Sequence, residues 1–562
     1  MQNRKTLRIL PVIPFVLAGA MGRAAEPDLA EAFAAMNADS IRARIAALSS
    51  DEFEGRAPAT PGEDKTIAWL AAEFKKLGLK PGNPDGTYVQ NVPMIGITSQ
   101  TAMRFNAGGS VLEPTPMTEC VVHSHRVVSR LEIKDSEVVF VGYGVVAPEY
   151  GWDDYKGVDV RGKTIVMLVG DPPVPDPRDP AKLDGTVFKG RAMTYYGRWT
   201  YKYEIASAKG AAACLIVHET GPAGYPFAVL GGTAGREECD LRTPDGNAGR
   251  VAVEGWLTLD SSRKLFAAAG RDFAALKKSA VGRDFKPVAL PATASFTVDN
   301  RIREIASHNV VARLAGSDPR VRNEWVIYSA HWDHLGRDPR LAGDQIFNGA
   351  LDNAAGVAAL LEIAQGFAAA PRAPRRSVLF LAFTAEEKGL LGSRYYAENP
   401  LYPLAKTLAD INFDGFQIFG SARDLEVIGA GNSTLEDVAA AIAARTGRVL
   451  VADTESEKGY FYRSDHFELA KQGVPGFYTQ RGIDIVGRPA GYGKQRREEY
   501  IASDYHKPSD EIKPWWDLVG AVTDAQLLLE LGWQVADSEV WPEWKTGSEF
   551  RARRNAMLKA AK

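Results

Sequence analysis

Apolar residues in the second half of the chain recur in two alternating patterns. Short apolar runs of the kind that form buried strands occur at residues 324–329, 377–383, 411–413 and 476–480. Between the first two runs lies the stretch 353–370, which is rich in Ala and Leu and long enough for a buried helix. Strands that alternate with helices are typical of an α/β fold, so we predict a sheet covered by helices on both faces.

The first 298 residues follow a different pattern. Helical spacing of apolar residues at 41–47 and 67–77 predicts two helices joined by a turn-rich loop. From residue 132 onward Gly and Pro are frequent, and apolar runs at 138–141 and 164–169 predict strands. We therefore expect a β-rich domain inserted into a catalytic domain. The expected bounds are 25–131 for the first part of the catalytic domain, 132–298 for the insert and 299–562 for the main part.

The N-terminus has the layout of a cleavable secretory signal. Three cations precede an apolar stretch at 9–20, and small residues follow it. This stretch is shorter than the roughly 20 residues that span a bilayer, and two prolines interrupt it. We expect a signal peptide over residues 1–24, with cleavage after Ala20, Ala24 or Ala25. Its removal on export would place the protein in the periplasm or outside the cell, without a stable membrane anchor.

Composition narrows the classes of function. The chain has 67 Lys and Arg against 70 Asp and Glu, so it is not basic enough to suggest a nucleic-acid partner. The chain has 562 residues, of which 45% are hydrophobic. This is more than a single hydrophobic core usually contains, so we predict two or more domains. Three cysteines allow at most one disulfide, and none has the spacing to Cys or His that a thiolate metal site needs.

Five residues with metal-binding side chains mark the α/β part, each at the end of an apolar run or in a turn. They are His331, Asp352, Glu387, Asp414 and His506. Three of them follow three separate predicted strands, and the carboxyl ends of such strands meet at one edge of a sheet. Two imidazoles and three carboxylates suit a pair of zinc ions with one bridging carboxylate. Each residue alone has a structural explanation, such as a helix N-cap for Asp352, but together they predict a metal site.

Further polar residues flank these five. Glu386 is a free carboxylate suited to a general base. Asp333 is placed to accept a hydrogen bond from the second ring nitrogen of His331, which metal-bound histidines usually require. Asp510 has either a similar role near His506 or a plain turn role.

The other histidines are expected to lie outside the metal site. His334 and His466 stand near the ligand motifs, but we expect neither to bind metal. The remaining four have no carboxylate in their sequence context and are expected to be surface or packing residues: His123, His125, His218 and His308.

The motifs around the five residues occur in an order that resembles the secreted double-zinc aminopeptidase family, whose members include glutamate carboxypeptidase and the catalytically inactive transferrin receptor. The resemblance spans residues 28–535 and rests on Ser-Ala-His-Trp-Asp-His-Leu-Gly, Asn-Gly-Ala-Leu-Asp-Asn-Ala-Ala-Gly, Phe-Thr-Ala-Glu-Glu-Lys-Gly, Ile-Asn-Phe-Asp-Gly and Asp-Tyr-His-Lys-Pro-Ser-Asp. It implies a zinc exopeptidase fold with a mixed, mostly parallel sheet. Segments at 154–166 and 206–217 resemble a protease-associated domain, which would be the insert.

Carried over position by position, the resemblance assigns two Zn²⁺ ions to the chain. His331 and Asp414 would bind one zinc, Glu387 and His506 would bind the other, and Asp352 would bridge both. With two zincs to activate a water and polarise the scissile carbonyl, this set would support peptide hydrolysis.

The resemblance also implies three supporting catalytic roles. Glu386 matches the general base, Asp333 its supporting carboxylate, and Tyr505 a donor to the tetrahedral oxyanion, with plain packing as the alternative for the tyrosine. One departure concerns the segment 415–417, Gly-Phe-Gln, because many relatives have an apolar residue after the metal aspartate. The shape of the side-chain pocket therefore stays open.

The sequence thus predicts an exported dizinc metallo-exopeptidase, first of all an aminopeptidase acting on peptides. A carboxypeptidase of the glutamate carboxypeptidase type is the nearest rival, and it needs cationic side chains that the sequence does not place. A glutaminyl cyclase has related architecture but a one-zinc site, which the five-residue set argues against. A receptor that keeps the fold would lack some ligands or the base. Residue preference, the native metal in each position and oligomeric state, monomer or homodimer, stay open.

Overall fold

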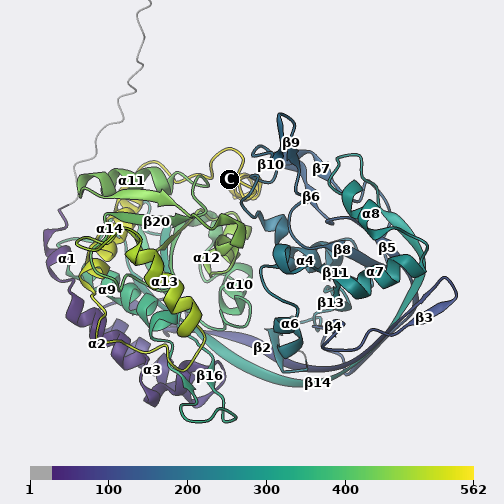
Figure 1. The fold of residues 1–562 in the computed structure, drawn as a ribbon. Helices are drawn as coiled ribbons and strands as arrows, with labels where there is room; N and C mark the ends of the chain where they lie inside the picture. The colour runs from purple at the N-terminus through teal and green to yellow at the C-terminus, as the bar shows by residue number, and fades with distance from the viewer. Residues whose placement is uncertain (1–27, 234, 562) are drawn as a thin grey trace, which may run out of the picture.

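The computed structural model describes residues 28–561 apart from Ala234 and shows a molecule with two lobes (Figure 1). The predicted signal segment 1–24 lies outside the described residues. Within the part of the chain that is described, none of the helices has both the length and the apolar character required to cross a bilayer.

One lobe is built on a mixed, mostly parallel sheet in the order β21-β20-β22-β19-β15-β18-β14. Strand β15 pairs in parallel with both β18 and β19, and β19 pairs in parallel with β22. At the flanks, β14 is antiparallel to β18, and β20 is antiparallel to β22. The bounds of the four inner strands are Trp325–His331 for β15, Ser377–Phe383 for β18, Thr407–Phe413 for β19 and Gly476–Gln480 for β22. The predicted fold class is confirmed, and each of the four predicted strands is present.

Side chains alternate between the two faces of the sheet along each strand. Both faces therefore present apolar side chains, and helices cover both. Val326 and Tyr328 of β15 point into one apolar core, and Trp325 and Ile327 point into a second core on the other face. The first core is closed by helices that include α2 (Ala38–Leu48), α9 (Ala355–Ala369) and α14 (Val519–Asp537), and the second by α10 (Leu391–Glu398) and α12 (His466–Lys471). Helix α9 forms the predicted buried helix, and twelve of its residues are buried.

The second lobe also contains parallel strands with helices against them. Strands β5 (Arg130–Phe140), β8 (Thr164–Leu168), β11 (Ala213–His218) and β13 (Val253–Thr258) pair in parallel in that order, and β4 (Cys120–His123) adds an antiparallel edge. Helices α4 (Trp199–Ala208) and α7 (Leu259–Ala268) lie against them. The core of this lobe includes Met103, Phe105 and Cys120, which precede residue 132. The expected domain bounds remain a prediction.

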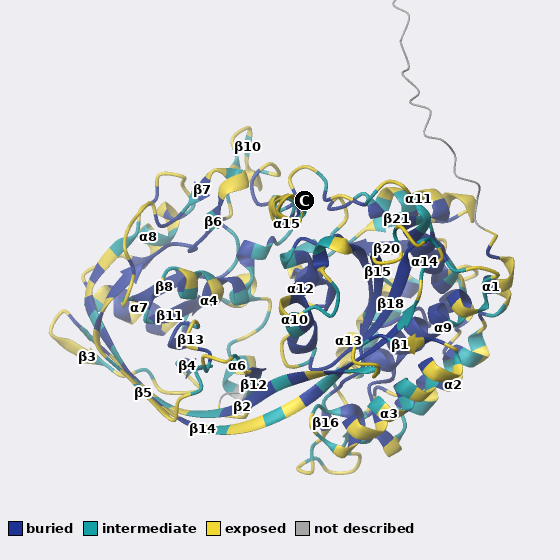
Figure 2. Cartoon of the chain, turned by 180° about the vertical axis from the view of Figure 1, so that it is seen from behind, coloured by how far each residue is buried: buried dark blue, intermediate teal, exposed yellow. Residues whose placement is uncertain are grey.

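Two long strands join the lobes. β2 (Val89–Ala107) and β14 (Val288–Leu314) pair antiparallel from Val310↔Val89 to Ala292↔Ala107 and form a curved ribbon beneath both lobes (Figure 1). Each lobe is dark with buried residues, whereas the ribbon shows exposed positions between them (Figure 2). The exposed positions of β14 in this stretch include Arg301, Arg303 and Glu304. The lobes therefore have separate cores.

Candidate metal centre

The five predicted metal ligands converge at one edge of the sheet in the first lobe. His331 is the last residue of β15, Asp414 follows the end of β19, and Glu387 lies four residues after β18. Asp352 precedes α9, and His506 follows α13 (Tyr492–Ser503). The convergence arises because parallel neighbouring strands end on the same side.

Asp352 lies between the two histidines. One of its carboxylate oxygens is 3.4 Å from Nε2 of His331, and the other is 3.2 Å from Nε2 of His506. Asp414 stands on the first side, with Oδ1 3.6 Å from Nε2 of His331. Glu387 stands on the second side, with Oε2 3.2 Å from Nε2 of His506. The side chains thus form two groups that share Asp352.

The donor set fits divalent cations. Nε2 of His331 and Nε2 of His506 are buried and have no hydrogen-bond partner among the described residues. Burial lowers the pKa of His506, but the carboxylates of Asp352 and Glu387 outweigh it and raise that pKa to about 10. Crowded carboxylates facing unpartnered imidazole nitrogens need positive charge at their centre, and N and O donors of this kind suit zinc.

Glu386 lies beside both groups without joining either one. Its Oε2 is 3.9 Å from Nε2 of His331, farther than the oxygens of Asp352 or Asp414. Burial raises the pKa of Glu386 well above its ordinary value, and His331 offsets this only in part. A carboxylate with a raised pKa holds a proton more readily, as a general base requires.

Asp333 supports the site differently from the expectation. Nδ1 of His331 is 3.2 Å from the main-chain carbonyl oxygen of Asp333 and 3.7 Å from the carboxylate. The carboxylate instead accepts hydrogen bonds from the backbone N–H groups of Glu386, at 3.0 Å, and Glu387, at 3.4 Å. Asp333 therefore orients the histidine through its backbone and the two glutamates through its side chain.

Tyr505 and Asp510 complete the wall around His506. The Tyr505 ring stacks on the His506 imidazole with centroids 3.8 Å apart, and its side chain is 44% exposed at a pocket. Asp510 accepts hydrogen bonds from the backbone N–H groups of Leu351 and Asp352, both at 3.1 Å. These hydrogen bonds favour a positioning role for Asp510 over a plain turn role. The residue that Asp510 positions is Asp352 and not His506.

Arg56 is a site residue that sequence reasoning missed. It is 1% exposed, and its guanidinium donates to the carbonyls of Trp332 at 3.0 Å, Asn348 at 2.7 Å and Gly349 at 3.0 Å. A fourth hydrogen bond reaches the carbonyl of Leu48. Trp332 follows the histidine that ends β15, and Asn348 and Gly349 precede the shared aspartate, so Arg56 ties two ligand loops together. The surrounding turn-rich sequence gives no sign of this.

We expect Arg56→Met to loosen the site and lower Tm. The substitution leaves four buried carbonyls without their donor, at a cost on the order of 3 kcal/mol or more. Thermal unfolding and zinc content would be measured beside Arg104→Met, which removes an exposed arginine of β2. Equal Tm and zinc content in the two variants would contradict the role assigned to Arg56.

His334 lies next to the candidate centre, and the expectation that it does not bind metal stays a prediction. Its Nδ1 is 2.7 Å from Oε1 of Glu387, and His334, Asp352 and Glu387 together could hold a metal. His466 does not join the centre. It is fully buried between the rings of Phe461 and Tyr478, at centroid distances of 4.6 and 4.8 Å, and burial lowers its pKa to about 3.

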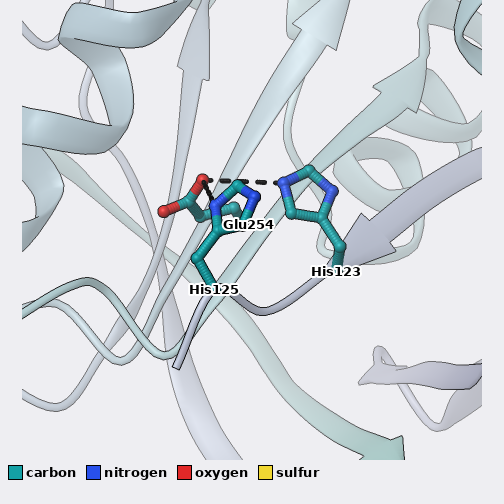
Figure 3. A group of neighbouring side chains, drawn as sticks. All are labelled: His123, His125 and Glu254. Carbon is teal, nitrogen blue, oxygen red and sulfur yellow. Dashed lines mark hydrogen bonds and ion pairs between the residues drawn. The ribbon is translucent and has the colours of Figure 1, made fainter. Parts of the chain in front are cut away.

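His123, His125 and His308 have no carboxylate nearby in the sequence, but the fold supplies one to each of them. Oε2 of Glu254 is 3.6 Å from Nε2 of His123 and 3.3 Å from Nδ1 of His125 (Figure 3). Nδ1 of His308 is 2.9 Å from Oε1 of Glu63. These carboxylates are distant in sequence, so no local pattern could reveal them. His218 fits its expected packing role, since its ring contacts aromatic rings that include Trp256 at 5.7 Å.

The histidine pair of the second lobe is already engaged by an arginine. Arg250 donates to Glu254 at 3.0 Å, and its Nη2 is 2.9 Å from Nδ1 of His125. Arg250 also pairs with Asp240 at 2.9 Å, and Asp240 pairs with Arg394 of α10 in the first lobe. The cluster in Figure 3 is thus part of an ion-pair network that connects the lobes, and we assign no metal to it.

The segment that carries the candidate centre is similar to known proteins. Residues 309–529 match the sequence model of peptidase family M28, which bears out the resemblance predicted from the motifs. Leupeptin-inactivating enzyme 1 of Streptomyces exfoliatus is 30% identical over 208 residues, 36% of this chain and 43% of that protein. Aminopeptidase NAALADL1 of Mus musculus is 33% identical over 132 residues, 22% of this chain and 16% of that protein. The chain spans less than half the length of these relatives.

Two solved structures of aminopeptidases are weakly similar to most of this chain. The aminopeptidase from Aneurinibacillus sp. strain AM-1 is 18% identical with a TM-score of 0.47, and the comparison covers 92% of this chain and 96% of that one. BSAP, a zinc aminopeptidase from Bacillus subtilis, is 17% identical with a TM-score of 0.41, covering 92% and 98%.

Proposed function

Because residues 309–529 match the sequence model of peptidase family M28, we propose that this chain is an exported dizinc aminopeptidase that removes N-terminal residues from peptides. The observation that carries the proposal is the pair of ligand groups sharing Asp352, with the free carboxylate of Glu386 beside them. The relative from Mus musculus is named an aminopeptidase, which favours the same reaction. Export rests on the signal-like segment 1–24.

In this proposal His331 and Asp414 would hold one zinc, Glu387 and His506 would hold the other, and Asp352 would be shared between them. Bound there, zinc would supply the Lewis acidity that polarises a peptide carbonyl and lowers the pKa of water. The backbone carbonyl of Asp333 keeps Nε2 of His331 free for metal by accepting from Nδ1, 3.2 Å away. His334 would support Glu387 from behind, through the 2.7 Å contact between Nδ1 and Oε1.

Proton transfer falls to Glu386. Its carboxylate takes the proton of the attacking water and delivers a proton to the leaving amine, a role that general bases in other enzymes fill with an effect of about 10²–10⁴-fold. Tyr505, which lines the pocket beside His506, would donate a hydrogen bond from its hydroxyl to the oxyanion.

The lobe that contains residues 132–298 would be a protease-associated domain that narrows access to the centre and helps select short peptides. Its contact with the first lobe includes the hydrogen bond between Lys189 and Asn432, at 2.9 Å, and the ion pair of Lys189 with Glu549, at 3.0 Å. Peptides are the expected partners. A role of this lobe in dimerisation is the alternative.

A carboxypeptidase is the second candidate, because the pocket above the centre contains cations that the sequence did not place. Three arginines line it: Arg463, Arg481 and Arg497. Such side chains grip carboxylates, which a carboxypeptidase substrate presents beside the scissile bond.

The experiment is mass spectrometry of a peptide mixture incubated with the protein, each peptide supplied with a free and an acetylated N-terminus. Stepwise loss of residues from free N-termini only, restored by zinc and stopped by a chelator, is the expected result. Trimming of acetylated peptides from the other end would establish the carboxypeptidase instead. Loss of ammonia from N-terminal Gln without cleavage would mean a cyclase, and both outcomes would overturn the aminopeptidase proposal.

A further inference from the structure

A cavity of about 260 Å³ opens above the candidate metal centre. Asp352, Glu386 and Asp414 line it on the metal side. Tyrosines and arginines line its other walls, together with Ile428 and Ile501. Whatever part of a substrate lies next to the scissile bond must occupy this cavity, so its cations bear on which substrates fit.

Arg481 differs from the other two arginines of the cavity. Arg481 is 8% exposed, its buried Nε has no hydrogen-bond partner, and its guanidinium forms no ion pair with any residue in the described part of the chain. Arg497 is neutralised by Glu426 at 2.7 Å, and Arg463 is exposed and lies over the ring of Tyr460. Arg481 is therefore the buried, uncompensated charge of the cavity.

Aromatic rings lie near Arg481, but no carboxylate forms an ion pair with it among the described residues. Its guanidinium lies 5.9 Å from the ring centroid of Phe419 and 5.8 Å from that of Tyr500. Burial, and next the charge of Arg497, lower the pKa of Arg481. An arginine held in this way is costly unless an anion pairs with it, and Asp414, the nearby carboxylate, is committed to the metal centre in the proposed function.

Gly415 accounts for how the guanidinium reaches this place. This glycine follows Asp414 and has φ of +76°, and a Cβ built on it would lie 2.6 Å from Nη1 of Arg481. A side chain at this position would require the guanidinium to shift from its present place. The glycine at 415 therefore leaves room for the cation of Arg481 in the pocket.

We propose that Arg481 binds a carboxylate of the substrate, so that this enzyme prefers peptides that place a carboxylate in the cavity. The inference rests on the proposed function for the reaction but concerns which peptides are cleaved. Arginine recognises carboxylates with two parallel N–H···O bonds. Two sources share this chemistry: the acidic side chain of an N-terminal Asp or Glu, and the α-carboxylate of a very short peptide.

The test uses substrate pairs that differ in one carboxylate. Glu-p-nitroanilide against Gln-p-nitroanilide reports on the side chain, and Leu-Gly against Leu-Gly amide reports on the α-carboxylate. With the zinc-loaded protein we expect the acidic member of at least one pair to have a kcat/KM about 10- to 100-fold higher, the range of a charged hydrogen bond. In Arg481→Met this preference should collapse, while kcat/KM for the neutral member changes by no more than about threefold.

Two further variants separate recognition from a structural role. Arg481→Lys keeps the charge without the fork and should retain part of the preference. Arg488→Met, in the same loop and exposed, should retain all of it. An equal loss on acidic and neutral members in Arg481→Met, with a lowered Tm, would mean that the stacked arginine is only structural and would overturn the proposal. So would the absence of a preference in both pairs.

Calorimetry keeps the inference testable even if the chain cleaves no peptide. Zinc-loaded protein would be titrated with L-glutamate and with L-glutamine, which differ in one carboxylate. Tighter binding of glutamate by about tenfold or more, lost in Arg481→Met, would uphold the carboxylate site while the proposed reaction failed. The proposal would be overturned if glutamate and glutamine bound with equal affinity to the wild-type chain and to Arg481→Met, and if Leu-Gly bound no more tightly than Leu-Gly amide.

Discussion

Glu386→Gln is expected to abolish nearly all turnover and to leave metal binding intact. The amide keeps the shape of the side chain but cannot take a proton from water, and loss of a general base typically costs about 10²–10⁴-fold in kcat. The carboxylate oxygen lies 3.9 Å from Nε2 of His331, outside both ligand groups, so zinc content should stay at the wild-type value. Steady-state kinetics on a cleaved peptide and elemental analysis of the same preparation check both parts.

The matched control for this variant is Glu398→Gln, an exposed glutamate at the end of α10. It should keep wild-type kcat. Turnover retained in Glu386→Gln would remove this residue from the role of base. Loss of zinc in Glu386→Gln would instead place the residue among the ligands.

Asp352→Ala is expected to disable both halves of the metal centre at once. Its two oxygens face two different histidines, at 3.4 and 3.2 Å, so each group loses a carboxylate. Removal of a residue that only supports a ligand already weakens metal affinity by about 10–100-fold, and loss of a shared ligand should weaken it further. We expect the zinc content after gel filtration to fall from two ions per chain to fewer than one, and hydrolysis to stop.

Asp344→Ala, eight residues earlier in the same region and exposed, is the control and should keep both ions. Loss of a single zinc in Asp352→Ala, with the other retained at wild-type affinity, would show that the aspartate serves only one group. The account would then have to replace the shared ligand with another carboxylate.

The sequence predicts elements best where the physical signal is local. Strand β18 (Ser377–Phe383) is an unbroken apolar run between polar residues, and its bounds agree with the structure. Strand β19 (Thr407–Phe413) was expected only at its last three residues, because Asp410 interrupts the apolar run. In the structure Asp410 is fully buried and accepts a hydrogen bond from Ser329, 2.8 Å away on the neighbouring strand. A tertiary contact thus accommodates a buried carboxyl group that the local pattern argued against.

The convergence of His331, Glu387 and Asp414 could also be predicted, since each of them ends or follows a strand of the same sheet. What surrounds them could not. Arg56 reaches carbonyls 276 to 293 residues away, and His125 meets Glu254 across 129 residues. The guanidinium of Arg481 lies beside Gly415, a proximity that only the fold reveals. These contacts depend on which loops meet after folding, and a single sequence holds no local trace of that.

The most direct test of the account is diffraction from crystals of the zinc-loaded protein, recorded at the zinc absorption edge. We predict two anomalous peaks, one beside His331 and Asp414 and the other beside Glu387 and His506, with Asp352 touching both. Absence of either peak, or a principal peak beside His123 and His125 in the second lobe, would contradict the dizinc centre proposed here.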